Sequence, residues 1–164
     1  SKSATIGFKA AGETILVIGE AQGHLGQSIW LREIAGSEAG PPPPVDLAAE
    51  KLNGDFIRRL IAEGKVSAVH DISDGGLLVA VAEMALAGGI GASLTGIDGV
   101  AAAFGEDQAR YVVTTNAPDA IAAEGIAVTR IGTTGGNAIA VAGDSVGLAD
   151  LRTAHEGFFP QLMG

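Results

Sequence analysis

The sequence predicts an α/β domain, in the broad sense that includes α+β folds, with helices covering a mixed β-sheet. Three observations lead to this prediction. Short β-rich apolar runs alternate with helical patterns along the chain, which is the order expected of helices packed on a sheet. The 164 residues are enough for one domain with a hydrophobic core. The composition, 47% hydrophobic and 18% charged, is typical of a globular protein and not of a disordered one.

The first predicted strand covers residues 14–18, a short β-rich apolar run that a glycine closes. Residues 28–33 are predicted to form a short helix, and the four prolines at 41–44 an extended segment. The prolines could mark a domain linker. However, only about 40 residues precede them, too few for a stable separate domain, so we interpret them as an internal connection.

Two helices have the clearest patterns. The first begins after Asp46, a suitable capping residue, and ends at Gly64, and its apolar residues recur every four positions: Leu52, Phe56 and Leu60. The second covers residues 74–89, places its larger apolar residues on one face and ends at a glycine pair.

The remaining apolar runs predict five more strands, at residues 65–72, 90–94, 109–115, 126–132 and 137–143. Short helices are expected at 99–104 and 117–125, and a final helix is expected to begin near Ser145. The stretch TTGG at 133–136 predicts a hairpin-like turn that pairs the last two strands.

Charge and composition exclude several classes of function. The net charge is −9, which disfavours binding to nucleic acid or to an anionic membrane. No apolar run reaches the roughly 18 residues that a membrane-spanning helix needs. The chain has no cysteine, so disulfides and thiolate metal sites are excluded, as expected of a protein in a reducing cytoplasm.

The segment VHDISDGG is the strongest candidate for a functional site. Asp71 falls at the end of a predicted strand, and Ser73 and Asp74 stand just before a predicted helix, where a side-chain oxygen can cap the first N–H groups. Free N–H groups at a helix N-terminus favour an anion such as phosphate. The Asp71 carboxylate is a ligand type that magnesium prefers. The pattern therefore indicates a phosphate-and-metal site.

A structural interpretation of the same segment is equally compatible with the residues. Asp74 or Ser73 would cap the helix, the pair Gly75–Gly76 would turn the chain, and His70 would occupy a position on the sheet. The segment matches neither a phosphate-binding loop of the GxxxxGK[ST] type nor a GxGxxG fingerprint.

A second polar cluster precedes the strand at 109–115, in the segment FGEDQARYVV. Glu106 and Gln108 could present carboxylate and amide groups to a polar ligand. The spacing favours a simpler interpretation, a solvated loop in which Arg110 pairs with a carboxylate at the surface.

Six segments of the chain together resemble the phosphoribosylformylglycinamidine synthases, enzymes of purine biosynthesis. In order they are GHLGQSIWLREI, PPPPVDLAAEKLNGDFIRRLI, VHDISDGGLLVAVAEMALAGGIGA, FGEDQARYVV, IGTTGG and LRTAHEGFFPQLM. The resemblance covers essentially the whole chain and is to the C-terminal domain of the second half of those enzymes. It implies that residues 1–164 are one C-terminal synthetase domain of a larger multidomain protein.

The family's fold and chemistry follow as expectations from this resemblance. The fold would be a three-layer α/β/α sandwich with partial ferredoxin-like topology. The whole enzyme would use ATP and glutamine-derived ammonia to convert formylglycinamide ribonucleotide to its amidine, through an iminophosphate-type intermediate. Related superfamily members are aminoimidazole ribonucleotide synthetase, selenophosphate synthetase and thiamine-monophosphate kinase.

The resemblance also implies roles for individual residues. Asp71 would be a magnesium ligand, Ser73 would contact ATP or ADP, and the Glu-x-Gln segment would contact the ribonucleotide substrate through Glu106 and Gln108. With the helix N-terminus, the predicted nucleotide-binding residues are Ser73, Asp74, Gly75 and Gly76. No catalytic residue is assigned to this chain, because the catalytic histidine of the family lies in the N-terminal domains.

The expected partners are the N-terminal synthetase domains of the same chain, a glutaminase and small accessory subunits. The chain would then form one wall of a composite site and would be inactive alone. Two alternatives remain open: a purely structural or assembly domain, and another ATP-dependent member of the same superfamily.

Overall fold

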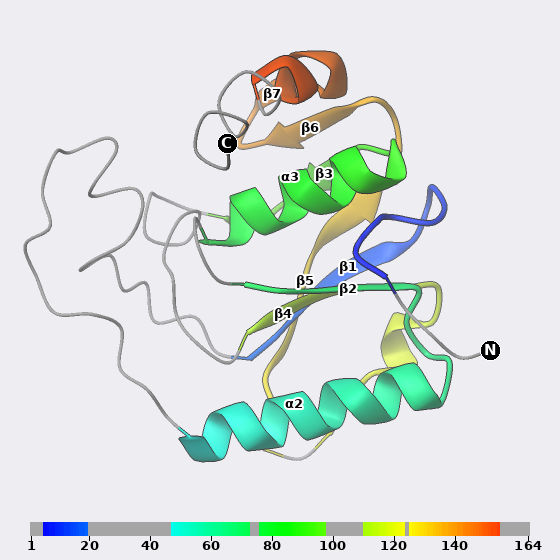
Figure 1. Ribbon diagram of the computed structural model, residues 1–164, viewed down its shortest axis with the longest axis vertical. Helices are drawn as coiled ribbons and strands as arrows, with labels where there is room; N and C mark the ends of the chain where they lie inside the picture. The colour runs from blue at the N-terminus through cyan, green and yellow to red at the C-terminus, as the bar shows by residue number, and fades with distance from the viewer. Residues whose placement is uncertain (1–4, 20–46, 73–75, 98–109, 124, 155–164) are drawn as a thin grey trace, which may run out of the picture.

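The computed structural model describes residues 5–19, 47–72, 76–97, 110–123 and 125–154 (Figure 1). The element order is β1 (Thr14–Ile18), α2 (Leu47–Ala62), β2 (Ala68–Asp71), α3 (Gly76–Gly88), β3 (Ala92–Leu94), β4 (Tyr111–Thr115), the 3₁₀ turn η1 (Pro118–Ala120), β5 (Val128–Thr134), β6 (Ala138–Val141) and β7 (Asp144–Gly147). Residues 148–154 are helical. The predicted α/β class is confirmed.

The strands form a seven-stranded sheet in the order β2-β4-β1-β5-β3-β6-β7. Neighbouring strands are antiparallel except β3 and β6, which are parallel. The predicted mixed sheet is therefore confirmed. At the β2 edge the N-terminal segment adds a parallel bridge between Thr5 and Ala68, and the Val69 N–H donates to the Thr5 carbonyl.

Two hydrophobic cores lie on opposite faces of the sheet. Side chains alternate along a strand, so Ile15 and Val17 of β1 pack in the core beneath α3, whereas Leu16 and Ile18 pack in the core beneath α2. Strand β4 divides in the same way between its two central valines. Helices α2 and α3 therefore cover the two faces of this part of the sheet, as Figure 1 shows.

Helix α2 follows its predicted pattern closely. Phe56, Ile57 and Leu60 are buried, and Gly64 has a positive φ of 68° just after the helix. The Lys65 N–H then donates to the Leu60 carbonyl, which satisfies one of the free carbonyls at the helix end. The predicted stop at Gly64 is confirmed, and the proposed cap, Asp46, lies outside the described residues.

The predicted hairpin between residues 126–132 and 137–143 is wrong. Strand β3 lies between β5 and β6, antiparallel to the first and parallel to the second. Gly91, just before β3, exchanges backbone hydrogen bonds with Gly135 and Gly136, so the glycine turn encloses the entry to β3. A turn signal is local and does not reveal that a third strand will occupy the space between its two arms.

Two helix predictions also need correction. In place of the helix predicted at 117–125, the described residues of this range contain the short turn η1, after which Ile121 is extended and buried beneath α2. The chain near Ser145 is strand β7, which pairs with β6 across Ala142 and Gly143, both at positive φ. The final helix begins after β7. The helices expected at 28–33 and 99–104, and the extended segment at 41–44, lie outside the described residues.

Several elements approach one another so closely that only glycine fits between them. A Cβ added at Gly91 would lie 2.1 Å from the Ala138 carbonyl oxygen, and one at Gly88 would lie 2.2 Å from the Phe8 carbonyl oxygen. These contacts fix the start of β3 against β6 and the end of α3 against the N-terminal segment. The Phe8 N–H also donates to the Met84 carbonyl, so this segment is held to α3 by backbone as well as by its buried ring.

A small network of polar groups joins Glu13, just before β1, and Ser67, just before β2, to Thr114 in β4. The Ser67 hydroxyl lies 2.8 Å from Glu13 Oε1 and 2.7 Å from the Thr114 hydroxyl oxygen. Glu13 is only 8% exposed, so these contacts compensate its carboxylate for lost water.

The helices within the described ranges are too short or too polar to span a lipid bilayer.

The contact at Gly91 leads to a stability prediction. Gly91→Ala should lower the free energy of unfolding by about 1–3 kcal/mol, the usual cost of forcing an extra methyl group into a filled space. Thermal and urea unfolding would measure the loss.

Gly147→Ala is the matched control, because a Cβ there would meet its nearest atom, Asp150 Oδ2, at an ordinary 3.7 Å. It should change stability by less than about 0.5 kcal/mol. Equal stability of the two variants would contradict the close approach of Gly91 to Ala138.

Candidate functional site

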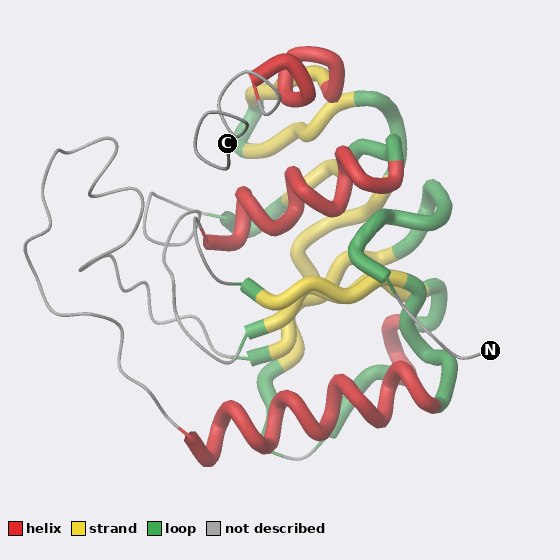
Figure 2. Tube along the Cα trace, in the orientation of Figure 1, coloured by secondary structure: helices red, strands yellow, loops and turns green. Residues whose placement is uncertain are grey.

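The ends of four strands meet at one end of the sheet. Tyr111, the first residue of β4, pairs with Asp71 at the end of β2 on one side and with Ile18 at the end of β1 on the other. The same Ile18 pairs with Val128, where β5 begins. Figure 2 shows the ends of β1, β2 and β4 side by side, next to the segments drawn in grey. We call this region the sheet terminus; it comprises residues 18, 71, 111 and 128.

The register brings together two polar segments that are far apart in the sequence. The Ile72 N–H donates to the Arg110 carbonyl at 2.8 Å, one step beyond the Asp71–Tyr111 pair. The segment that follows β2 and the segment that precedes β4 therefore leave the sheet from the same point. Nothing in their sequence spacing, 30 residues or more, indicates this proximity.

Asp71 presents its carboxylate at the end of β2. The side chain is 65% exposed, and Oδ1 lies 3.2 Å from Nδ1 of the neighbouring His70. Its second oxygen and its exposure leave it accessible to a ligand. The prediction that Asp71 stands at the end of a strand is confirmed.

His70 lies between the sheet and α3 with two acidic neighbours. Its side chain is 17% exposed, and Nε2 lies 3.6 Å from Glu83 Oε1, an ion-pair distance just beyond hydrogen-bond length. The Glu83 carboxylate is the main cause that raises the pKa of His70, with a smaller contribution from Asp71, while partial burial opposes the rise. The sequence pattern predicts only a place on the sheet for His70, and it carries no signal of the contact with Glu83 on the next helix.

Helix α3 begins at Gly76, five residues after Asp71. Gly76 is buried and has a φ of 78°, a left-handed conformation that glycine adopts without strain. The first turn of α3 contains no acidic residue, so no carboxylate within it competes for the partial positive charge at the helix N-terminus. This end of the helix is thus suited to an anionic group.

The described part of the site offers a single exposed carboxylate to a metal. Its oxygens suit magnesium, which prefers hard oxygen ligands in octahedral geometry. Within the described ranges, no group of three or more histidine, cysteine, aspartate or glutamate residues is arranged to hold a metal. Asp71 fits a magnesium ion as one ligand of several, and the others must come from elsewhere.

The remaining predicted site residues lie outside the described residues: Ser73, Asp74, Gly75, Glu106 and Gln108. Arg110, in contrast, is described, and the expectation that it lies at the surface is wrong, because it is only 2% exposed. Its position immediately before a run of aromatic and β-branched residues was the available signal that it would be drawn inward.

A mixed sheet covered by helices on both faces, with Asp71 at the end of one strand and α3 beginning at Gly76, defines an α/β domain with a polar strand-to-helix junction. The family model for "AIR synthase related protein, C-terminal domain" matches residues 10–143. The chain belongs to this family.

Curated relatives extend the relationship over the whole chain. Phosphoribosylformylglycinamidine synthase subunit PurL of Rhodopseudomonas palustris (strain TIE-1) is 55% identical over 175 aligned residues, covering 100% of this chain and 24% of that protein. PurL of Parvibaculum lavamentivorans is 57% identical over 171 residues, covering 97% of the chain and 23% of that protein. The chain thus spans about a quarter of the length of these relatives, and the resemblance found in the sequence is confirmed.

Solved structures share the fold at low sequence identity. Thermotoga maritima PurL complexed with FGAR has a TM-score of 0.69 at 18% identity, covering 91% of this chain and 29% of that chain. A thiamine-monophosphate kinase from Stenotrophomonas maltophilia has a TM-score of 0.60 at 21% identity, covering 89% and 55%. At this identity the likeness establishes the fold alone.

The contacts of His70 lead to a titration prediction. In magnesium-free buffer, NMR titration should give His70 a pKa above the ordinary value of 6.5, and Glu83→Gln should lower it, because the amide keeps the shape but removes the charge. Glu63→Gln, just after α2 on the other face of the sheet, is the control and should leave the pKa of His70 unchanged.

The same pairing should affect stability in a defined pH range. Since the folded-state pKa is raised, the stabilisation is fully present below about pH 6.5, the unfolded-state value, and is lost as the pH rises through the folded-state pKa. The stability difference between wild type and Glu83→Gln should therefore shrink as the pH rises. A pKa of His70 at or below 6.5 would rule out this pairing.

Proposed function

We propose that this chain is the C-terminal domain, residues 1–164, of a PurL-type phosphoribosylformylglycinamidine synthase. The observation that carries the proposal is the 55% identity to PurL over the entire chain. The proposed whole enzyme is a carbon–nitrogen ligase of de novo purine biosynthesis that works in the cytoplasm.

The proposed reaction joins ammonia to an activated amide. ATP transfers its terminal phosphoryl group to the amide oxygen of formylglycinamide ribonucleotide, which gives ADP and an iminophosphate. Glutamine-derived ammonia then displaces phosphate, and the amidine forms. PurL structures complexed with FGAR, ATP, ADP and AMPPCP support nucleotide and substrate binding in this type of protein.

In this proposal the sheet terminus is one wall of a magnesium–nucleotide site. Asp71 would supply one carboxylate oxygen to magnesium, which would offset the charge of the nucleotide phosphates when bound. The N-terminus of α3 would direct its free N–H groups at a phosphate, and Gly76 would allow the close approach. His70 would hold Asp71 in place through the contact between its Nδ1 and Oδ1.

The residues outside the described ranges complete the proposed wall. Ser73, Asp74 and Gly75 follow Ile72 directly, and we assign them to nucleotide binding. Glu106 and Gln108 stand just before Arg110, and we assign them to the ribonucleotide substrate. The hydrogen bond between Ile72 and Arg110 supports a shared site, because both segments leave the sheet from this pair.

The proposed partners are the N-terminal synthetase domains of the same protein, a glutaminase and small accessory subunits. A solved PurLQS structure of T. maritima supports an assembly of this kind. We infer that the isolated chain has no synthetase activity, because the catalytic histidine and most ATP contacts of the family lie in the N-terminal domains.

A second candidate function is a structural or assembly domain, in which the acidic turn only caps α3. The ion pair of His70 with Glu83 would suit that role too, since it joins β2 to α3 without any ligand. The two functions differ in whether the Asp71 charge affects nucleotide binding.

Substitution of Asp71 in the full-length enzyme separates the two candidates. Asp71→Asn keeps the size of the side chain and removes the charge that offsets the metal. Affinity for the magnesium–nucleotide complex should fall by about tenfold to a hundredfold, the usual effect of altering a metal-site group. The melting temperature without nucleotide should change little. Equilibrium binding and thermal unfolding, each with and without magnesium, provide the measurements.

Asp150→Asn is the matched control, because Asp150 is an exposed carboxylate in the final helix, far along the chain from the sheet terminus. It should leave both readouts unchanged. Nucleotide affinity that is the same in wild type and Asp71→Asn, with or without magnesium, would refute the metal role and favour the structural domain.

A further inference from the structure

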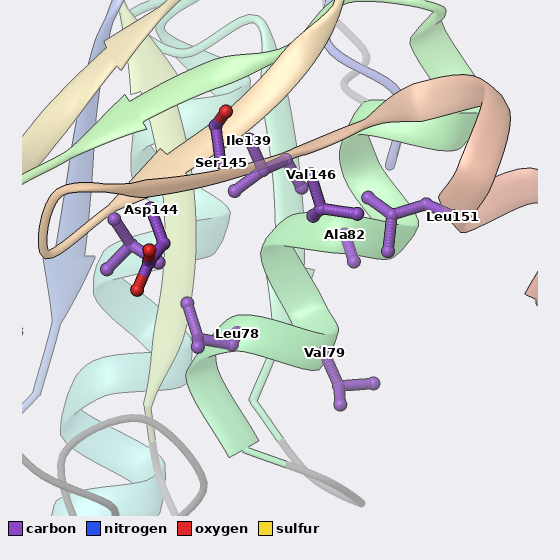
Figure 3. Close-up of a pocket in the computed structure, with 9 residues that line it drawn as sticks. Leu78, Val79, Ala82, Ile139, Asp144, Ser145, Val146 and Leu151 are labelled. Atoms are coloured by element: carbon purple, nitrogen blue, oxygen red, sulfur yellow. The ribbon is translucent and has the colours of Figure 1, made fainter.

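An apolar groove lies on the side of the molecule formed by the last elements of the chain. It has a volume of about 330 Å³ and runs between the outer face of α3 and the β6–β7 hairpin. Figure 3 shows Leu78 and Ala82 on α3, facing Val146 of β7 and Leu151 of the final helix. Only one end of the groove, at Asp144 and Ser145, carries polar side chains.

The side chains that line the groove are accessible to a partner. Val146 is 40% exposed, and Leu78, Ala82 and Leu151 are each partly exposed. Partly exposed apolar side chains gathered in one groove usually mark a binding surface, whereas single exposed apolar residues are ordinary. Leu52 on α2, 47% exposed, is such a single residue.

We propose that residues 155–164 of this chain fold back into the groove and cover it. The described chain ends at Ala154, only three residues after Leu151, which lines the groove. The ten residues that follow, HEGFFPQLMG, include four large apolar side chains: Phe158, Phe159, Leu162 and Met163. Ten extended residues reach up to about 33–36 Å, so the segment is long enough to enter the groove.

The tether favours this segment over other occupants. A short connection gives the segment an effective concentration in the millimolar range at the groove, so weak apolar contacts suffice to hold it. A second copy of the chain would need an interface of about 1,200 Å² or more, far larger than one groove lined by a few side chains. This proposal does not depend on the proposed function.

The lack of cysteine allows a clean cross-linking test in the 164-residue chain. Asp144→Cys places a thiol at one end of the groove, and Gln161→Cys places one in the segment without removing an apolar anchor. With a short thiol cross-linker, this pair should form an intramolecular product. The control pair is Leu52→Cys with Gln161→Cys, whose first thiol lies on α2 across the sheet. We expect the groove pair to react at least about tenfold faster, because the docked tether raises the local concentration.

Two further variants test the apolar contacts. Phe158→Ser combined with Phe159→Ser should reduce the rate of the groove pair to that of the control, and so should Val146→Lys. Because Val146 is already 40% exposed, Val146→Lys should leave the fold intact, which circular dichroism would check.

Equal rates for the groove and control pairs would overturn the proposal and leave the groove to a domain outside this chain. Cross-linked dimers in place of the intramolecular product would also overturn it, in favour of a second copy. A groove-pair rate that the phenylalanine substitutions do not change would show that the segment is near but not docked, which is a third way for the proposal to fail.

Discussion

The position of β4 between β2 and β1 is the constraint on which the rest of the structure depends. Both of its edges are paired and both of its faces are buried, with Val112 and Val113 fully enclosed by the two cores. A one-residue shift of this strand would exchange its two faces, so that Val112 would point toward α2 and Val113 toward α3. The register therefore fixes at once which helix covers which face and which residues stand at the sheet terminus.

Close contacts at two glycines position the elements around these central strands. Gly88 lets α3 end against the N-terminal segment, and Gly91 lets β3 start against β6. With helices on both faces of the sheet, the strand ends are the part of the domain where polar groups can meet a ligand without disturbing a core. Asp71 and the N-terminus of α3 lie there.

The electrostatics of the sheet terminus follow from one histidine between two carboxylates. His70 joins Asp71 on its own strand to Glu83 on α3, so the position of an exposed acid is linked to the packing of a helix. In the proposed site, the described residues would supply one magnesium ligand and one helix N-terminus, which is too little for a complete magnesium shell. The proposed function therefore requires other groups to complete the site.

The sequence by itself determined the elements whose signals are local. The four-residue periodicity of α2, its end at Gly64 and the strand that leads to Asp71 are all indicated by residue patterns within short stretches of the chain, and all were predicted. Only the tertiary structure decided which strands pair: β3 enters between β5 and β6, and the region of Ser145 becomes a strand because β6 is available beside it. The same is true of the burial of Arg110 and of the contact between His70 and Glu83. Such outcomes depend on side chains and strand edges distant in sequence, which compete for the same space only once the chain has folded.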